Sequence, residues 1–259
     1  MQIVIPMAGV GKRFADAGYK EIKPLIKVDG KPIIEYVIDL FPGENDFVFI
    51  CNKEHLATTP LKKVLKKLKP NAIIVPIDSH KLGPIETVLR GKEYIKDTEP
   101  VIINHCDFYQ IWDYKNFKKK LAKEKIDGAI ICYKGFHPHL LGPDFYAGVK
   151  TNKNDVFIET KEKFSYTPNK MDTWQSSGMY YFKNGAIAKK YLKKAKDKKL
   201  LTNGEYYIPW AYNLMKKDKL KSIVYPAKYF CQWGTPTDLE AYLYWSKYFF
   251  SMKNSLSTK

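Results

Sequence analysis

Residues 3–25 read IVIPMAGVGKRFADAGYKEIKPL, an apolar run followed at once by glycines and cations. The apolar run predicts a buried strand, because the strands of a parallel sheet are covered on both faces. Gly9 and Gly11 carry no side chain, so backbone N–H groups in this loop can approach an anion. Arg13 and Lys23 add positive charge. The stretch is compatible with a triphosphate-binding loop, and equally with an ordinary basic surface loop.

The two common glycine loops do not fit this stretch. A dinucleotide fingerprint has the pattern G-x-G-x-x-G, and Phe14 stands where its third glycine belongs. A P-loop has the pattern G-x-x-x-x-G-K-[ST]. If Gly11 and Lys12 are aligned with its G-K pair, a glycine is required five positions before Gly11, and Ser or Thr is required directly after Lys12. Pro6 and Arg13 occupy those two positions. Any phosphate site here therefore belongs to another class of loop.

Strand-like and helix-like segments alternate over the first half of the chain. Apolar runs predict strands over residues 2–7, 46–51, 72–77, 101–107 and 128–134. Apolar residues at helical spacing predict helices over residues 32–41, 61–68, 83–95 and 114–126. This order is typical of a mostly parallel sheet with helices on both faces. Ligands of such sheets bind beyond the carboxyl ends of the strands, where we expect Gly9, Gly11 and Asp107 to lie.

The alternation changes after Lys134. Residues 146–164 are typical of a β-hairpin, residues 178–185 predict a further strand, and residues 235–250 predict a helix. No Gly/Ser-rich linker divides the chain, so we expect a single domain with a two-part layout. The last nine residues, 251–259, are expected to form a frayed tail.

Composition favours a globular cytoplasmic protein. Of the 259 residues 45% are hydrophobic, yet no apolar run approaches the roughly 18 residues that span a bilayer. The N-terminus lacks the charged and apolar regions of a signal peptide. The four cysteines are dispersed and form no C-x-x-C, which favours reduced thiols. We therefore expect no membrane association.

The net charge of +17 raises nucleic acid as a partner. However, the lysines fall on the polar faces of the predicted helices, as in residues 61–68, where the apolar residues share the opposite face. Arg13 and Arg90 are the only arginines, although arginine is the residue that reads bases and phosphates in a bidentate manner. A solvated basic surface is favoured, and no specific nucleic acid is expected.

Residues 7–14, MAGVGKRF, and residues 22–34, IKPLIKVDGKPII, resemble the sugar-phosphate nucleotidyltransferase family. The family pattern runs A-A-G-x-G-x-R-L, then P-K-P-L and V-x-G-K-P, and this chain departs from it at Met7, Phe14 and Ile22. Such a long pattern is more specific than a lone G-x-G. Further similar segments span most of the chain: LGPIETVL at 82–89, NHCDFY at 104–109, the pair Glu162-Lys163, SSGMYYF at 176–182 and WGTPTDL at 233–239.

The resemblance implies an α/β fold of the nucleotide-diphospho-sugar transferase type, as one domain over residues 1–259. Residues 1–134 would mainly bind nucleotide, and residues 135–250 would mainly bind the acceptor. The implied activity is attack by an acceptor phosphate on the α-phosphorus of an NTP, with release of pyrophosphate. A phosphate monoester is already ionised at pH 7, so this reaction needs charge neutralisation and alignment rather than a general base.

The resemblance also implies roles for individual residues. Arg13 would hold the β- and γ-phosphates, Lys23 would bridge the α-phosphate, and Asp107 would bind Mg²⁺, for which Mn²⁺ can substitute. A helix N-cap is the alternative role for Asp107. The implied nucleotide-binding residues are Met7, Ala8, Gly9, Val10, Gly11, Lys12, Ser79, His80, Gly83, Pro84, Glu86, Thr87 and Cys106. The implied acceptor-binding residues are Glu162, Lys163, Ser176, Ser177, Gly178, Gln232 and Trp233.

One departure from the family concerns the metal. The family usually has a second metal-binding aspartate two residues before the late Gly-Thr, and this chain has Gln232 there. A neutral amide is a weak Mg²⁺ ligand. Either Asp107 alone holds the ion, or Glu159 or Glu162 compensates. Gln232 could instead shape the acceptor pocket.

The segments HKLGPIETVL and QWGTPTDL resemble a branch of the family that serves capsule and surface-polysaccharide synthesis. That branch includes cytidylyltransferases that activate phosphoglutamine, so CTP is the first choice of nucleotide. A hexose 1-phosphate with dTTP, UTP or GTP is the alternative. A non-catalytic nucleotide-sugar sensor is the alternative of another class. The expected partners are an NTP and a phosphorylated small-molecule acceptor, and a homo-oligomer is compatible with the sequence.

Overall fold

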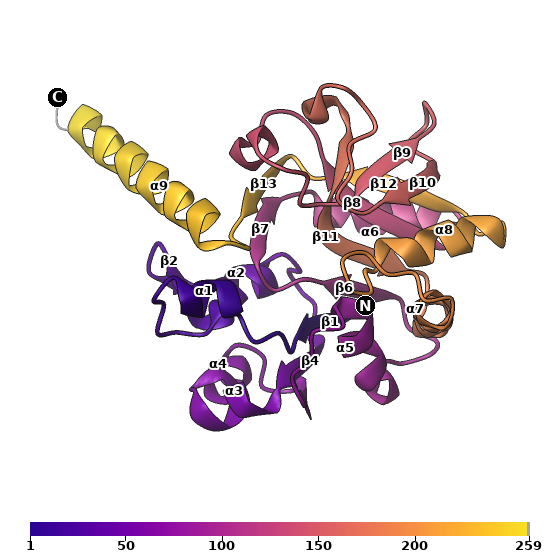
Figure 1. The fold of residues 1–259 in the computed structure, drawn as a ribbon, viewed down its shortest axis with the longest axis horizontal. Helices are drawn as coiled ribbons and strands as arrows, with labels where there is room; N and C mark the ends of the chain where they lie inside the picture. The colour runs from indigo at the N-terminus through magenta and orange to yellow at the C-terminus, as the bar shows by residue number, and fades with distance from the viewer. Residues whose placement is uncertain (258–259) are drawn as a thin grey trace.

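The computed structural model describes the backbone of residues 1–257 and the side chains of residues 1–253. Figure 1 shows one body from which the C-terminal helix projects. The strands are β1 Gln2–Met7, β2 Lys27–Val28, β3 Lys31–Pro32, β4 Asp46–Asn52, β5 Ile73–Ile77, β6 Val101–Asn104, β7 Phe108–Ile111, β8 Gly128–Tyr133, β9 Gly148–Thr151, β10 Phe157–Lys161, β11 Trp174–Phe182, β12 Ser222–Pro226 and β13 Tyr229–Gln232. The α-helices are α1 Lys12–Asp16, α2 Ile33–Asp39, α3 Lys53–Thr58, α4 Leu61–Leu68, α5 Pro84–Arg90, α6 Tyr114–Lys123, α7 Gly185–Asp197, α8 Pro209–Lys217 and α9 Pro236–Ser257.

A mixed nine-stranded sheet forms the centre of the body. Its order is β10-β9-β11-β6-β1-β4-β5, with β8 also paired to β11 and β12 paired to β8. The strands β6, β1, β4 and β5 run parallel to one another, as the β-α alternation predicts. β11 runs antiparallel to β6, β8 and β9. The expected α/β fold with a mixed central sheet is confirmed.

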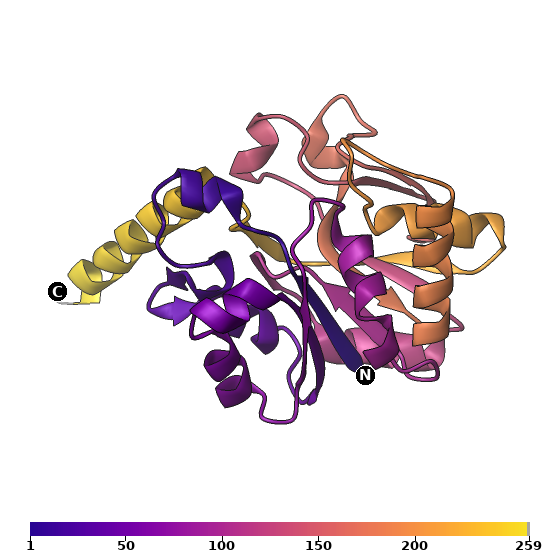
Figure 2. The ribbon, with the colours of Figure 1, turned by 60° about the horizontal axis from the view of Figure 1, so that its bottom comes forward.

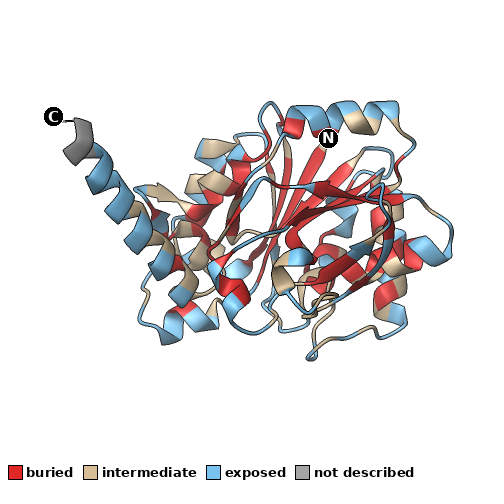
Figure 3. Ribbon diagram, turned by 90° about the horizontal axis from the view of Figure 1, so that it is seen from above, coloured by how far each residue is buried: buried red, intermediate tan, exposed pale blue. Residues whose placement is uncertain are grey.

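Helices cover both faces of this sheet, so each central strand contributes to two cores. In β1, Ile3 and Ile5 belong to the core shared with α2, α4 and α6, whereas Val4 belongs to the core shared with α5, α7 and α8. Figure 2 shows α5 beside α7, and Figure 3 shows buried strands between helices whose outer faces are exposed. The exposed lysine faces that the sequence predicts lie on these helices.

Several boundaries differ from the sequence-based expectation. The strand expected over 178–185 spans Trp174–Phe182, and Gly185 begins α7. The helix expected over 83–95 ends at Arg90 and is followed by a 3-10 turn at Lys92–Tyr94. Gly91 joins the helix to this turn and packs closely against Ile50. A Cβ added at Gly91 would lie 2.5 Å from Ile50 Cδ1. The strand expected over 101–107 ends at Asn104. Helix α9 continues through Ser257, beyond the expected start of the tail at residue 251, and residues 258–259 lie outside the described part.

The strands β7 and β13 form a separate antiparallel ribbon that carries site residues at one end. Gln232 at the end of β13 pairs with Phe108 at the start of β7. The backbone N–H of Trp233 donates to the carbonyl oxygen of Asp107 over 3.1 Å. The segment at Asp107 and the segment at Gln232, which are distant in sequence, are thereby held side by side. A strand follows Asp107, so the alternative role of helix N-cap is wrong.

Within residues 1–257 we find no helix with both the length and the apolar character that crossing a bilayer requires.

Candidate functional site

A hollow of about 790 Å³ lies at the carboxyl ends of β1 and β6. Its volume is typical of sites for small molecules. One wall is the loop after β1, and another is the turn after β6 that contains Asp107. The opposite walls come from residues 143–147, 162–163 and 203–207. This is the position that the open α/β sheet predicts for a ligand.

The glycine loop connects β1 to the short helix α1. Gly11 has a φ of 67°, a left-handed conformation that favours glycine. A Cβ added at Gly9 or Gly11 would meet no atom of the chain within 4 Å. Open space therefore lies over the loop on the side of the hollow. This arrangement leaves room for an anion to approach the backbone.

Two cations on α1 line the same wall. Lys12 Nζ lies 2.9 Å from Asp16 Oδ2, so part of its charge is compensated within the helix. Arg13 lines the hollow, is exposed, and forms no ion pair with any described residue. Arg13 is therefore the cation of this loop that is available to a ligand.

Lys23 and Asp107 form an ion pair inside the hollow. Lys23 Nζ lies 3.1 Å from Asp107 Oδ2 and 3.4 Å from the carbonyl oxygen of Gly234. Their side chains are only 22% and 29% exposed. Burial opposes both charges, but the attraction between the two groups outweighs it, so the pKa of Lys23 is raised and that of Asp107 is lowered. Both groups stay charged at neutral pH.

The donor set suits a metal ion held through one protein carboxylate. No group of three or more His, Cys, Asp or Glu side chains among the described residues can hold an ion. Glu159 lies on β10, exposed and 3.8 Å from Lys150, and does not line the hollow. Mg²⁺ is commonly bound through one or two carboxylates and substrate phosphates, which fits Asp107 beside a nucleotide.

Gln232 is fixed by the helix that follows it. Its Nε2 donates to the carboxylate of Asp238, which also accepts a hydrogen bond from Thr235 Oγ1. The amide oxygen of Gln232 is buried without a hydrogen-bond partner in the described structure. Such a group costs free energy unless something else satisfies it. Gln232 also lines the hollow, so a bound molecule can supply that partner.

The wall near α5 is rigid. His80 Nδ1 accepts from the backbone N–H of Leu82 over 3.2 Å, and His80 Nε2 lies 3.0 Å from Thr87 Oγ1. Burial lowers the pKa of His80, which favours the neutral ring. Gly83 has a φ of 85°, and a Cβ there would lie 2.8 Å from the carbonyl oxygen of Tyr206. Glycine is therefore required where this wall meets the loop before α8.

The walls opposite the glycine loop carry three carboxyl groups, those of Asp144, Glu162 and Glu205. Burial raises the pKa of Glu162 to about 8, with nearby Lys163 opposing and Glu205 reinforcing the shift. A carboxyl group protonated at neutral pH is a poor metal ligand, so Glu162 is a poor replacement for the missing aspartate. Tyr207 donates a hydrogen bond to Glu205. Lys163 Nζ lies 5.6 Å from the centre of the Tyr207 ring.

Of the residues that the resemblance implies for the site, all but five line the hollow. Ser79 is exposed. Glu86 pairs with Arg90 of its own helix at 3.0 Å and with Lys196 of α7 at 2.6 Å. Ser176 donates to the Tyr180 hydroxyl over 3.0 Å, and Ser177 donates to the carbonyl oxygen of Ile131 over 3.1 Å, both within the buried part of β11.

Trp233 is the fifth of these residues. It is fully buried, stacks on Tyr109 with ring centres 6.0 Å apart, and contacts Tyr36 and Tyr242 edge to face. Its ring therefore supports the ribbon and α9 rather than the hollow. Cys106 does line the hollow, and burial raises the pKa of its thiol to about 12, so it stays protonated.

Sequence reasoning missed the loop between α7 and α8. Asn203, Glu205 and Tyr207 line the hollow from this loop. Asn203 and Gly204 have positive φ angles of 52° and 80°. The turn-like TNG at residues 202–204, followed by an acid and two tyrosines, was the available signal. This signal predicts a turn but does not place the loop in the hollow, because its position depends on the contact with Gly83.

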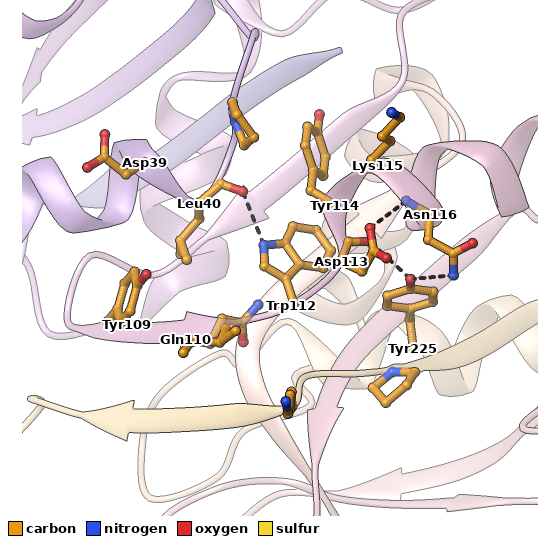
Figure 4. A pocket seen from close by; sticks show the side chains of 14 residues that line it. Asp39, Leu40, Tyr109, Gln110, Trp112, Asp113, Tyr114, Lys115, Asn116 and Tyr225 are labelled. Atoms are coloured by element: carbon orange, nitrogen blue, oxygen red, sulfur yellow. Dashed lines mark hydrogen bonds between the residues drawn. The ribbon is translucent and has the colours of Figure 1, made fainter.

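A second hollow, of about 650 Å³, lies along β7 and contains none of the predicted site residues. Figure 4 shows hydrogen bonds among its polar groups. Trp112 Nε1 donates to the carbonyl oxygen of Leu40 over 3.1 Å, and Asn116 Nδ2 donates to the hydroxyl of Tyr225 over 3.0 Å. No glycine and none of the predicted site residues line this hollow, so we place the site in the first hollow.

Comparison with known proteins begins with curated relatives. The chain is 27% identical over 226 residues to the bifunctional protein GlmU of Clostridioides difficile (strain 630), covering 84% of this chain and 45% of that protein. It is 24% identical over 225 residues to the same-named protein of Staphylococcus epidermidis (strain ATCC 35984), covering 86% and 47%. The chain thus spans about half the length of these relatives.

Solved structures share the fold at low identity. The nucleoside-diphosphate-sugar pyrophosphorylase from Vibrio cholerae RC9 matches with a TM-score of 0.73 and 20% identity, covering 93% of this chain and 99% of that chain. The inositol-1-phosphate CTP transferase from T. maritima matches with a TM-score of 0.71 and 16% identity, covering 93% and 92%. A family model described as the MobA-like NTP transferase domain matches residues 3–156, which is more than half of the chain. The chain therefore belongs to the MobA-like NTP transferase family.

Proposed function

We propose that the protein is a nucleotidyltransferase that joins an NTP to a phosphorylated small molecule. The observation that carries this proposal is the partly buried ion pair between Lys23 and Asp107, 3.1 Å long, in a hollow that the glycine loop lines. Family membership and the curated relatives support the same class of reaction. Arg13, the cation of the loop that has no ion pair with a described residue, lines the same hollow.

In the proposed reaction an oxygen of the acceptor phosphate forms a bond to the α-phosphorus. The bond from the α-phosphorus to the bridging oxygen breaks, and pyrophosphate leaves with the electron pair. Lys23 stabilises the negative charge that develops on the α-phosphate, and Arg13 holds the leaving phosphates. No proton has to be removed from the nucleophile, because a phosphate monoester is already ionised. The thiol of Cys106 stays protonated, so we assign it no role as a nucleophile.

Asp107 is the residue we assign to a divalent metal, with Mg²⁺ as the expected ion and Mn²⁺ as a substitute. Such an ion neutralises phosphate charge and orients the nucleotide. Lys23 already contacts the same carboxylate, so the two cationic groups would share Asp107. Gln232 contributes no charge, and its amide orientation is fixed by Asp238.

CTP is the nucleotide we propose first, with phosphoglutamine as the acceptor and CDP-glutamine for surface polysaccharide as the product. The resemblance of residues 80–89 and 232–239 to that branch supports this choice. The similar T. maritima protein is itself described as a CTP transferase. A hexose 1-phosphate with dTTP, UTP or GTP is the second candidate, which the description of the V. cholerae protein as a nucleoside-diphosphate-sugar pyrophosphorylase favours.

The test is a matrix of four NTPs against phosphorylated acceptors, read as pyrophosphate release. We expect activity with CTP, loss of activity in EDTA, and recovery on adding Mg²⁺. Asp107→Asn should abolish the response to Mg²⁺, whereas Asp144→Asn, at another acid in the hollow, should retain it. Activity with dTTP, UTP or GTP and a hexose 1-phosphate would select the second candidate.

The non-catalytic alternative gives a different result in the same matrix. A nucleotide-sugar sensor would bind a nucleotide-diphospho compound tightly by calorimetry and release no pyrophosphate from any pair. The intact Arg13, Lys23 and Asp107 argue against that outcome, because a sensor has no need of a cation at the reacting phosphorus.

A further inference from the structure

The charges that line the hollow differ between its walls. The glycine-loop wall carries cations and suits phosphates, whereas the opposite walls carry the carboxyl groups of Asp144, Glu162 and Glu205 beside one cation, Lys163. Asp144 is compensated, because Lys170 Nζ lies 3.4 Å from its Oδ1. Neither Glu162 nor Glu205 forms an ion pair with any described residue. Two acids of the hollow are therefore available to a bound molecule.

These two acids lie close enough to affect each other. The charge of Glu205 adds to the effect of burial in raising the pKa of Glu162, and Tyr207 donates a hydrogen bond to Glu205. Lys163 opposes the shift, yet its Nζ pairs with neither acid and lies 5.6 Å from the centre of the Tyr207 ring. The residues Glu162, Glu205 and Tyr207 form an acidic corner of the hollow. Neighbouring carboxyl groups without a cation between them are unfavourable, so a positive charge on a bound molecule would relieve both.

Aromatic rings surround the same part of the hollow. Phe145, Tyr146, Tyr180 and Tyr207 all line it. The face of an aromatic ring attracts a cation, and rings of this kind recognise ammonium groups in ligands. A neutral hydroxyl group can hydrogen-bond to a carboxylate, but it leaves the negative charge uncompensated. The carboxyl groups and the rings together therefore favour a cationic group over a hydroxyl group.

An independent observation on Gln232 also indicates a ligand that donates hydrogen bonds. Gln232 lines the hollow and is only 7% exposed. Its Nε2 is held by Asp238, which leaves the buried amide oxygen without a partner in the described structure. An amide oxygen accepts from an N–H or O–H group and cannot bond to a phosphate oxygen. The molecule that completes this hollow therefore carries hydrogen-bond donors as well as phosphate.

We propose that the acceptor carries an ammonium group, which binds in the acidic corner while the acceptor phosphate faces the glycine-loop wall. This inference rests on the proposed nucleotidyl transfer and narrows its acceptor to an aminated phosphate compound. Phosphoglutamine belongs to that class, whereas a neutral hexose 1-phosphate does not. A metal ion is a poor occupant of the corner, because no three His, Cys, Asp or Glu side chains among the described residues can hold one.

The test uses pairs of probes that differ only in the group meant for the acidic corner. Aminoalkyl phosphates with chains of two to six carbons are compared with hydroxyalkyl phosphates of the same length. Isothermal titration calorimetry measures the Kd of each probe for the full chain, with and without α,β-methylene CTP, which cannot release pyrophosphate. At the best chain length the ammonium probe should bind roughly 10-fold tighter or more, because hydrogen bonds to charged groups are the stronger ones.

Substitutions in the corner should remove this preference. Glu205→Gln and Glu162→Gln should each weaken binding of the ammonium probe several-fold and leave the Kd of the hydroxyl probe nearly unchanged. Glu99→Gln is the matched control, because Glu99 is exposed and lies outside the hollow. A merely structural role would weaken both kinds of probe alike. Circular dichroism checks that each variant is folded.

Binding of the ammonium probe should also release a proton. The carboxyl group of Glu162, with a pKa of about 8, is mostly protonated at pH 7, and a neighbouring ammonium group would ionise it. The other titratable groups that act on or respond to Glu162 are Lys163, Glu205, Tyr180 and Tyr207. Calorimetry in two buffers of different ionisation enthalpy should show up to about one more proton released with the ammonium probe than with the hydroxyl probe. Glu162→Gln should abolish this difference.

Three results would overturn the proposal: no detectable binding of any ammonium probe, equal Kd values for the two probes at every chain length, or a preference that survives both substitutions. Glucose 1-phosphate binding more tightly than every ammonium probe would assign the corner to a hydroxyl-bearing acceptor instead. The proposed function fails in a different way, by the absence of pyrophosphate release from every pair of substrates. None of these binding measurements requires nucleotidyl transfer, so the two failures are distinguishable.

Discussion

Inside the hollow, Lys23 contacts two parts of the chain that are distant from each other in sequence. Its ammonium group meets Asp107, which follows β6, and the carbonyl oxygen of Gly234, which follows β13. Proline at position 24 fixes the backbone next to it, at the first turn of the 3-10 helix Lys23–Leu25. A single side chain thus joins the glycine-loop wall to the ribbon.

The first prediction concerns the two cations of the site. Lys23→Ala and Arg13→Ala should each lower turnover roughly 100-fold or more, because each removes charge that stabilises the transition state. The measurement is pyrophosphate release, with circular dichroism to verify a native fold. Lys27→Ala, an exposed lysine on β2, is the control and should keep wild-type turnover. Near-wild-type turnover in Lys23→Ala or Arg13→Ala would contradict the assigned roles.

The second prediction concerns Glu162. Its folded pKa of about 8 lies above the ordinary value of 4.5, so the folded state binds a proton that the unfolded state releases between those values. The free energy of unfolding should therefore fall as pH rises from 4.5 to 8, by at most about 1.4 kcal/mol per pH unit from this group.

Glu162→Gln removes this titration. Urea unfolding at pH 5, 6, 7 and 8 should show that the variant loses less stability with rising pH than the wild-type protein does. Glu159→Gln, an exposed glutamate on β10, is the matched control and should keep the wild-type slope. Identical slopes for wild type and Glu162→Gln would show that Glu162 is already ionised in the folded state.

At the scale of elements, the loop between α7 and α8 shapes the wall of the hollow opposite the glycine loop. The backbone N–H of Tyr206 donates to the carbonyl oxygen of Leu82 over 2.9 Å, and that of Ile85 donates to the carbonyl oxygen of Tyr206 over 3.2 Å. These two bonds fix the loop to the start of α5. Tyr207 and Glu205 are thereby held in the hollow.

The third prediction follows from this junction. Gly83→Ala should lower the free energy of unfolding by about 2–4 kcal/mol, because φ is positive and the new Cβ meets the Tyr206 backbone at 2.8 Å. Gly43→Ala is the control, since Gly43 also has a φ of 85° but no atom lies within 4 Å of its Cβ position. Its cost should be about 1 kcal/mol. Equal effects in urea unfolding would show that the contact with Tyr206 is unimportant.

The elements that the sequence predicts well are those whose pattern is local. Central strands such as β1 and β4 are apolar between their polar end residues because both faces are covered, and α4 shows its apolar face in eight residues. The loop 198–208 could not be placed, because its position depends on a contact with Gly83. The same holds for His137 and His139. They are buried among Tyr133, Tyr146 and Phe230, which come from distant segments.

For the candidate site, more of the residues proposed to bind the nucleotide than of those proposed to bind the acceptor line the hollow. The glycine loop, Lys23 and Asp107 come from short motifs at strand ends, and the structure brings them into one hollow. Trp233 and Ser177 lie in similar motifs, yet their side chains face the core. A motif gives the position of a backbone segment, but which side of a strand faces the ligand is set by packing.

For the whole molecule, the large positive charge is spread over the helix surfaces. The lysines of α4, α6 and α7 lie on exposed faces, and several pair with nearby acids, as Lys120 does with Glu124 and Lys194 with Asp218. This distribution gives solubility and a general attraction for anions without a defined groove for a duplex.

The fourth prediction is therefore a weak, unselective interaction with nucleic acid. Fluorescence anisotropy should detect binding to duplex DNA at low salt that disappears near roughly 200 mM salt and does not depend on sequence. A duplex sequence bound tightly at that salt concentration would contradict this and would revive nucleic acid as a partner.

The ion pair between Lys23 and Asp107 affects how the hollow binds free cations when no nucleotide is present. The carboxylate already has a cation of its own, so a free ion from solution gains little by replacing an ammonium group that the fold places there. A nucleotide changes that balance, because its phosphates offer Lys23 a new partner and leave Asp107 available. We therefore expect the pocket to ignore the abundant free cations of a cell and to accept an ion together with its nucleotide.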